Sequence, residues 1–379
     1  MSLAVQGVVA FELTGRNRSV GIVIAAQGIS QGLLGPVGGA LADRFAKKTV
    51  VLACQLLIAA VFGALTALVV ADLITILLLS LGSFVIGAAF SFLGPARNAW
   101  VVELVEKGRS GNAIALTQIA LNASRILGPV IAAVVLGIAA LGTGSAFATM
   151  SLFYVIAVAM TLSLPTVKPQ VQAERNSVLG DITEGVRVVA NHPSLRFLIP
   201  SYLLVIMTGF GYITVLPGLV SNELGREPRD ITTILAVAAV GGLMVSVFVA
   251  AIADSRFAIK IYWLAGISFG AALAASAASP DFPALVITML LVGVTSGAFQ
   301  TLSIAIVSGL TPQQYLGRVL SLTFLGFAAS NLFSFPFGVV ADAAGERLAL
   351  GGAGIAIAMI ALGFGIASAL APKGLPPSR

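Results

Sequence analysis

The fold is decided by the stretch Gly35-Pro-Val-Gly-Gly-Ala-Leu-Ala-Asp-Arg-Phe-Ala-Lys-Lys48, which lies between two apolar runs. Each run is long enough to cross a bilayer as a helix, which takes about 20 residues. Basic residues crowd into the short loop between the runs, and such loops stay in the cytoplasm. A related stretch, Ala253-Asp-Ser-Arg-Phe-Ala-Ile-Lys260, lies between two later apolar runs. The sequence therefore predicts two copies of one membrane bundle.

The composition indicates an integral membrane protein. Of the 379 residues, 58% are hydrophobic and only 9% are charged, whereas soluble proteins carry about 25% charged residues. A single cysteine, Cys54, excludes a disulfide within the chain, and a single histidine, His192, excludes a histidine-based metal site. No basic patch is interleaved with aromatic residues, so no nucleic-acid partner is expected. We also expect no metal and no cofactor.

Twelve apolar segments are predicted, six on each side of a polar stretch. The first is only 13 residues long and rises about 20 Å, against about 30 Å of hydrocarbon. We therefore expect part of this helix to be missing, through a late start codon or a truncated fragment. The predicted division is an N-terminal bundle at 1–165, a cytoplasmic linker at 166–195 and a C-terminal bundle with a short tail at 196–379. The segments are 1–13, 19–41, 49–71, 73–96, 112–140, 144–164, 196–221, 229–252, 260–279, 283–309, 316–341 and 348–371.

The positions of basic residues predict the topology. With the loop at 42–48 inside, fifteen of the 21 basic residues are cytoplasmic, five are external and Arg125 lies within a span. This bias places both termini in the cytoplasm of a multi-pass protein of the bacterial inner membrane. The linker contains an amphipathic helix that begins near Ser177. It is either a helix lying on the inner membrane surface or a plain connector.

The motifs resemble those of the major facilitator superfamily. Gly39-Ala-Leu-Ala-Asp-Arg-Phe-Ala-Lys-Lys48 is similar to its cytoplasmic signature, with Ala46 in place of a glycine. Gly94-Pro-Ala-Arg-Asn-Ala99 and Ala123-Ser-Arg-Ile-Leu-Gly-Pro129 resemble the branch of enterobactin exporters and macrolide efflux pumps. Gly128 and Pro129 are similar to the start of the antiporter motif. The resemblance implies an all-α membrane fold of two pseudo-symmetric six-helix bundles that works as a monomer.

A cytoplasmic gate is predicted around the two charged loops. The resemblance implies that Asp43 ties the first bundle to the start of the eleventh span, and Asp254 makes the pseudo-symmetric contact. Breaking such contacts switches access from one side of the membrane to the other. The alternative is that the basic residues only set the topology. The predicted gate residues are Asp43, Arg44, Lys47, Lys48, Arg97, Asp254, Arg256 and Arg318.

A substrate cavity is predicted from polar residues within the spans. Gln118, Asn122 and Arg125 fall on one face of the fifth span. An arginine near mid-membrane is costly unless it has a function or a partner, and it offers five donors to anionic oxygens. The alternative is a structural arginine. Further predicted cavity residues are Gln27, Gln31, Gln300 and Asn331, the last two being equally consistent with interhelical hydrogen bonds.

Glycines on the second span predict close packing against the eleventh span. Gly28, Gly32, Gly35 and Gly39 recur on one helical face. Small residues let membrane helices approach each other closely.

These features predict a secondary transporter rather than an enzyme, since no Walker A sequence or zinc-ligand spacing is present. The resemblance implies proton-coupled export of amphipathic small molecules such as siderophores, drugs or macrolides. Glu12 is the possible coupling acid, and the proton and the lipid bilayer are the other expected partners. A phospholipid or lysophospholipid transporter is an alternative, supported by a laterally open apolar groove between the bundles. A membrane partner or sensor without transport is another, if the first helix is truly incomplete.

Overall fold

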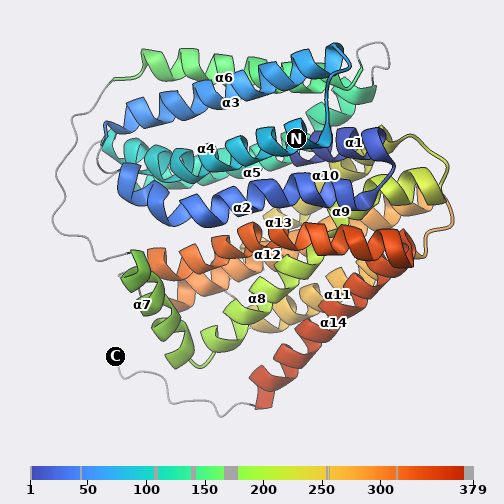
Figure 1. Cartoon of the computed structure of the whole chain (residues 1–379). Helices are drawn as coiled ribbons and strands as arrows, with labels where there is room; N and C mark the ends of the chain where they lie inside the picture. The colour runs from blue at the N-terminus through green and yellow to red at the C-terminus, as the bar shows by residue number, and fades with distance from the viewer. Residues whose placement is uncertain are drawn as a thin grey trace. The chain divides into compact units, whose positions relative to one another are not determined.

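The computed structural model describes residues 2–42, 45–105, 110–137, 142–165, 178–252, 255, 257–312 and 315–370. Every predicted span is confirmed as helical (Figure 1). Among the described residues, nine helical segments are long and apolar enough to cross a membrane. The helices are α1 Ser2–Thr14, α2 Asn17–Ala42, α3 Lys47–Val70, α4 Ile76–Glu103, α5 Ser110–Gly137, α6 Gly144–Ser163, α7 Val178–Asn191, α8 Leu195–Gly209, α9 Tyr212–Gly218, η2 Leu219–Glu223, η3 Pro228–Asp230, α10 Ile231–Ile252, α11 Ala258–Ala277, α12 Phe282–Leu310, α13 Leu316–Ala344 and α14 Glu346–Leu370.

The seventh span is broken, which the sequence analysis did not predict. α8 ends at Gly209, and α9 begins at Tyr212 and continues into the π-helical turn η2. Pro217 lacks a backbone N–H, so the α-helical hydrogen-bond pattern cannot pass through it unchanged. π-Helical turns are frequent at functional sites.

The chain packs as two compact units. The first comprises Met1–Arg175, Ile213–Ala236 and Asn331–Ala343, and the second comprises the rest. The first unit therefore takes segments from the later half of the chain, including parts of α10 and α13. The division into bundles at 1–165 and 196–379 stays a prediction, because the units group residues by packing rather than by chain order.

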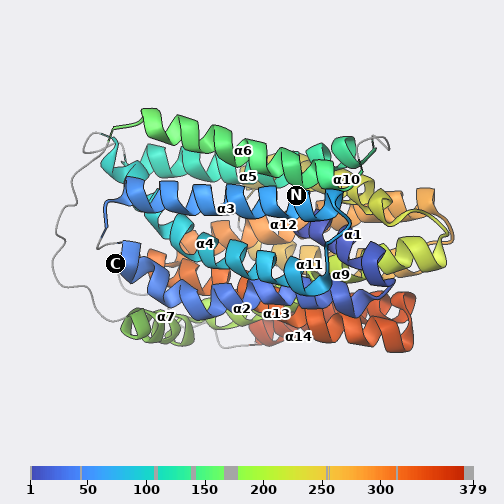
Figure 2. The ribbon, with the colours of Figure 1, turned by 45° about the horizontal axis from the view of Figure 1, so that its top comes forward.

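The core of the first unit is formed by α2, α3, α4 and α6. α2 lies along α4, as Figures 1 and 2 both show, while α3 packs between α4 and α6. Phe62 stacks on Phe147 with ring centroids 6.3 Å apart, and both are almost fully buried. This core fixes the helices from which the polar side chains of the candidate site project.

The core of the second unit is an aromatic stack. The Tyr262 and Phe299 rings lie 4.6 Å apart, and Tyr202 stacks on Phe299 at 5.8 Å. The buried Tyr262 hydroxyl is 3.0 Å from Ser201 Oγ, which satisfies its hydrogen-bonding capacity. Arg347 donates to the carbonyls of Ala277 and Ser279 at 2.9 and 2.8 Å, capping the end of α11.

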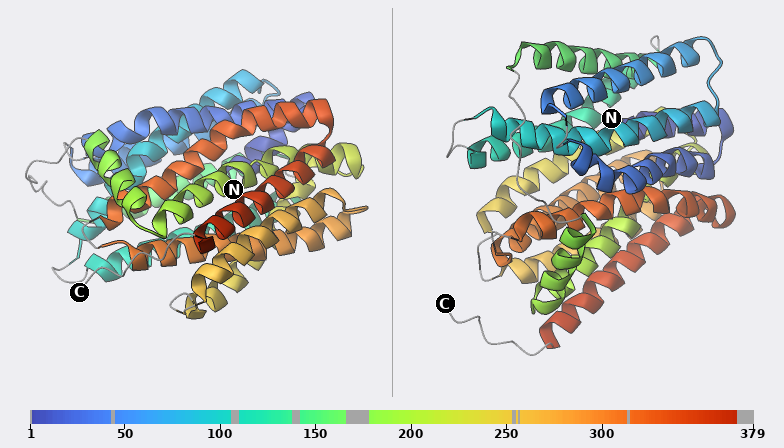
Figure 3. Two further views of the ribbon diagram at one scale, coloured as in Figure 1. Left: turned by 90° about the horizontal axis from the view of Figure 1, so that it is seen from below. Right: turned by 60° about the vertical axis from the view of Figure 1, so that its left-hand side comes forward.

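The amphipathic linker helix packs on protein. Figure 3 shows α7 as a short green helix beside α8, and Val189 is buried against that helix. Glu184 forms an ion pair with Arg318 Nη1 at 2.6 Å, and Gly185 lies against the Arg318 backbone. Val186 is half exposed. The contacts of the described part of α7 join it to α8 and to the beginning of α13.

The start of α8 carries a titratable cap. His192 Nδ1 accepts hydrogen bonds from the backbone N–H groups of Ser194 and Leu195 at 3.2 and 3.3 Å. Only a neutral imidazole accepts at this atom. Burial lowers the pKa of His192, so the folded state binds this proton less readily than the unfolded chain does.

We therefore expect part of the stability to be lost on acidification. As the pH falls below the unfolded pKa of about 6.5, the unfolded state gains a proton first, so stability declines until the lower folded pKa is reached. Thermal unfolding in detergent should show a larger drop in Tm between pH 7.5 and 5.5 for the wild type than for His192→Asn. Asparagine keeps an acceptor but does not titrate. Equal drops in both proteins would contradict this role.

Candidate functional site

Two predicted cavity residues meet inside the first unit. Asn331 on α13 donates from Nδ2 to Gln31 Oε1 on α2, at a long 3.5 Å. One turn earlier on α2, Gln27 is only 7% exposed, and its Oε1 has no partner among the described residues. A buried amide oxygen without a partner is unfavourable by about 1–3 kcal/mol, so such atoms are normally met by water or a ligand.

Gln6 on α1 extends this polar group and was missed in the sequence analysis. It is fully buried, and neither Oε1 nor Nε2 has a hydrogen-bond partner in the described part of the chain. α1 packs along α2, the helix that carries Gln27 and Gln31. A glutamine inside a short apolar helix was the signal that could have identified it. We call Gln6, Gln27, Gln31 and Asn331 the amide cluster.

The other predicted cavity residues do not join this cluster. Gln300 donates to Ser296 O within its own helix at 3.4 Å. Nearby, Thr301 on α12 donates to Ser246 Oγ on α10 at 3.3 Å, an interhelical hydrogen bond. The side chains of Gln118, Asn122, Arg125 and Pro129 lie outside the described residues, although their backbone belongs to α5.

Gly128 on α5 lines a cavity of about 410 Å³ within the first unit. Its walls are mostly apolar and include Phe62, Phe90 and Tyr154. The phospholipid alternative depends on a groove between the two bundles. This cavity lies inside one unit, so it does not provide that groove.

Lys47 and Lys48 bind within the first unit. Lys47 Nζ lies 3.2 Å from Glu103 Oε1, with side chains only 7% and 16% exposed. Lys48 Nζ donates to the carbonyls of Leu162 and Leu164 at the end of α6, at 3.0 and 2.5 Å. These contacts connect α3 with α4 and α6, so both lysines stabilise the packing of one unit.

The remaining gate residues are only partly described. Asp43, Arg44, Asp254 and Arg256 lie outside the described residues. Arg97, near the end of α4, has a buried Nε without a partner in the described ranges. Arg318 pairs with Glu184, so its described contact is to the linker helix.

At the opposite end of α2, a carboxylate of α13 caps the helix. Asp342 accepts from the backbone N–H groups of Asn17 and Arg18 at 2.8 and 3.1 Å. The same helices cross closely there: a Cβ on Gly21 would lie 2.5 Å from Ser334 O, and one on Gly338 would lie 2.6 Å from Asn17 O.

The predicted packing of the second span on the eleventh is thus present, but different glycines mediate it. Gly21 and Gly338 form the crossing, whereas a Cβ on Gly32 or Gly35 would have no described atom within 4 Å. The sequence pattern identified the partner helix and misplaced the contact by about three turns.

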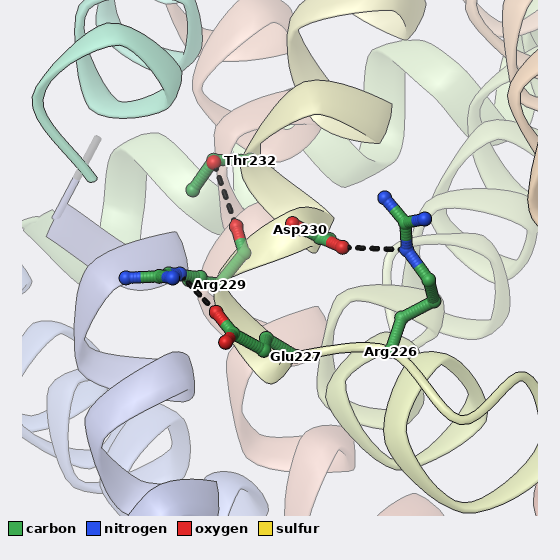
Figure 4. Close-up of polar contacts among 5 residues, drawn as sticks. All are labelled: Arg226, Glu227, Arg229, Asp230 and Thr232. Carbon is green, nitrogen blue, oxygen red and sulfur yellow. Dashed lines mark hydrogen bonds and ion pairs between the residues drawn. The ribbon is translucent and has the colours of Figure 1, made fainter. Parts of the chain in front are cut away.

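A second group of contacts at this end involves the loop after the broken seventh span. Arg226 pairs with Asp230 at 2.8 Å, and Arg229 pairs with Glu227. η3 packs against α1 and α5, and Arg229 extends toward the pale blue N-terminal helices in Figure 4. Glu12, near the end of α1, is within electrostatic range of both Arg229 and Glu227.

Comparison with known proteins decides the family. The model of the Major Facilitator Superfamily matches residues 1–334. The chain belongs to the Major Facilitator Superfamily. It is therefore a membrane transporter of the major facilitator type.

Individual relatives of this major facilitator chain are distant. It is 24% identical over 318 residues to the staphyloferrin A transporter of Staphylococcus aureus, covering 83% of this chain and 78% of the relative. A crystal structure of the nucleoside transporter NupG matches with a TM-score of 0.78 at 14% identity, over 97% of this chain and 94% of that one. A bacterial homologue of ferroportin in its inward-facing state matches with a TM-score of 0.68 at 16% identity, over 96% of both chains. These two structures support the major facilitator fold.

Proposed function

We propose that this chain exports amphipathic small molecules of the siderophore or drug type by alternating access, coupled to protons. One observation carries the proposal. Segments 213–236 and 331–343, which follow the linker, pack in one compact unit with the first six spans. The contacts described above place Asp342 and η3 at the start of α2 and beside α1. The charge bias predicts that this end faces outside.

Such an arrangement suits one state of a two-state transporter. Contacts that close one end can be exchanged for contacts at the other end, and a substrate shifts the balance only if it binds the two states differently. The amide cluster lies on α1, α2 and α13, the helices that meet in these contacts. Its unpartnered buried amide atoms are free to bond a polar substrate.

A siderophore-type substrate is supported by the staphyloferrin A transporter among the relatives. It is also supported by Arg125, whose guanidinium would bind anionic oxygens in two-point fashion. Glu12, close to Arg229 and Glu227, is the proposed coupling acid, because its protonation would change the charge balance of this group.

Transport into inside-out vesicles tests the proposal. The substrates are staphyloferrin A, an anionic catecholate siderophore and a lipophilic cationic dye, each with and without an imposed proton gradient. We expect gradient-dependent uptake of an anionic siderophore, and a loss of at least about tenfold in Arg125→Gln, because one charge-assisted hydrogen bond contributes about 1.5–3 kcal/mol. Arg125→Lys is the matched variant, which keeps the charge and loses the planar donor geometry.

The outcomes separate the possibilities. Uptake of the dye alone, equal in wild type and Arg125→Gln, would make Arg125 structural and favour a drug transporter. Absence of uptake for every substrate, with folded protein present in the vesicles, would contradict the export function.

A further inference from the structure

The contact between α2 and α13 follows one face of each helix. Ser334, Gly338 and Asp342 recur every four residues and therefore share a face of α13. Ser334 lies at Gly21, Gly338 lies at the Asn17 carbonyl, and Asp342 reaches the first N–H groups of α2. The stripe on α13 thus covers the first two turns of α2.

The Asp342 contact is electrostatically favourable. The first N–H groups of a helix have no partners within the helix, and that end carries a partial positive charge. The Asp342 carboxylate meets two of these N–H groups with its two oxygens. Since the acid lies 325 residues from Asn17 in sequence, the contact exists only while α13 remains at this end of α2.

The predicted inner gate has the same form in reverse. In the sequence, Asp43 directly follows the last residue of α2, and its predicted partner is the beginning of the eleventh span. Asp342 lies near the end of α13 and caps the beginning of α2. The same helix pair therefore carries an acid at each end, one on each helix.

We propose that Asp342 is the latch that holds the predicted outer end closed and that it alternates with Asp43. The proposal rests on the alternating-access function proposed above. When Asp342 leaves the N-terminus of α2, the crossing at Gly21 and Gly338 opens and the outer side of α13 becomes accessible. When it returns, the outer end closes, and the predicted Asp43 contact is free to break.

Cysteine accessibility tests this latch directly. The chain has one cysteine, Cys54, so Cys54→Ala gives a background without thiols. Ser334→Cys then reports on the face of α13 that α2 covers, since Ser334 is buried. A membrane-impermeant maleimide is applied to right-side-out vesicles. We expect Asp342→Ala to raise the labelling rate by about fivefold, the effect of losing a charged cap of about 1 kcal/mol.

Two controls isolate the contact. Asp281 also caps a helix, since its Oδ1 accepts from Ala284 N at 2.8 Å, but it does so locally at the start of α12. Asp281→Ala should leave the labelling rate unchanged. Arg18→Ala should do the same, because the donor to Asp342 is the backbone N–H of Arg18 and not its guanidinium.

Each outcome decides between the possibilities. Unchanged labelling in folded Asp342→Ala overturns the proposal, as does an equal rise in Asp281→Ala. If Asp342→Ala fails to fold, Asp342→Asn takes its place, since it retains one acceptor oxygen and should give a smaller rise. No rise in Asp342→Asn would then overturn the proposal. A rise in labelling in a protein that moves no substrate would keep the latch and refute the export function.

Discussion

Gly293→Ala should abolish the assembly of the second unit. A Cβ at Gly293 on α12 would lie 2.6 Å from Ala238 C and 2.7 Å from Ala238 Cα on α10, and it would overlap the Ala238 carbonyl oxygen. Backbone atoms cannot move aside by a change of rotamer, so the two helices would have to separate. Overpacking typically destabilises by about 1–3 kcal/mol, and a clash with backbone lies at the upper end or beyond.

Size-exclusion chromatography of a fluorescent fusion measures this effect as the loss of the monodisperse peak. Gly309→Ala is the matched control on the same helix, because a Cβ there meets no described atom within 4 Å. Alanine is also the better helix former, by up to about 1 kcal/mol. A normal peak for Gly293→Ala would show that α10 and α12 do not cross at this point.

Lys47→Met should destabilise the first unit strongly. The change leaves Glu103 without its cation at a site where the carboxylate is only 16% exposed. Removing one partner of a buried ion pair typically destabilises by about 3–5 kcal/mol, because the remaining charge is desolvated and unpaired. Thermal unfolding in detergent should show a Tm well below that of the wild type.

Two further variants test the cause. Lys48→Met removes hydrogen bonds to the Leu162 and Leu164 carbonyls at an exposed position, so its effect should be smaller. The double variant Lys47→Met/Glu103→Leu removes both charges and should recover most of the lost stability. If the double variant is as unstable as Lys47→Met alone, the ion pair is not the source of the effect.

Helix positions followed from the sequence because the bilayer imposes one rule on every span. Each backbone polar group in the membrane must be bonded within the segment, so an apolar run of sufficient length becomes a helix. The predicted segments 73–96 and 316–341 correspond to α4 and α13 within a few residues at most ends. The break after Gly209 did not follow, because it depends on how the backbone passes Pro217.

The candidate site followed only in part. Gln31 and Asn331 were both predicted as cavity residues, yet their sequence separation gave no sign that they touch. Gln6 and Asp342 were overlooked or considered peripheral, because a single polar residue in an apolar run has no periodicity to reveal it. Lys47 was predicted for the gate, and its contact with Glu103 lies inside the first unit.

The sequence by itself determined that this is a membrane protein, where its helices lie and to which family it belongs. These properties depend on local hydrophobicity, on the charge of short loops and on contiguous motifs such as Gly39–Lys48. The tertiary structure alone decided which helices meet: α13 with the start of α2, and η3 with α1 and α5. Within the membrane, packing depends on the fit of small residues and on isolated polar pairs. Gly21, Gly338 and Asp342 act only through a partner more than 300 residues away.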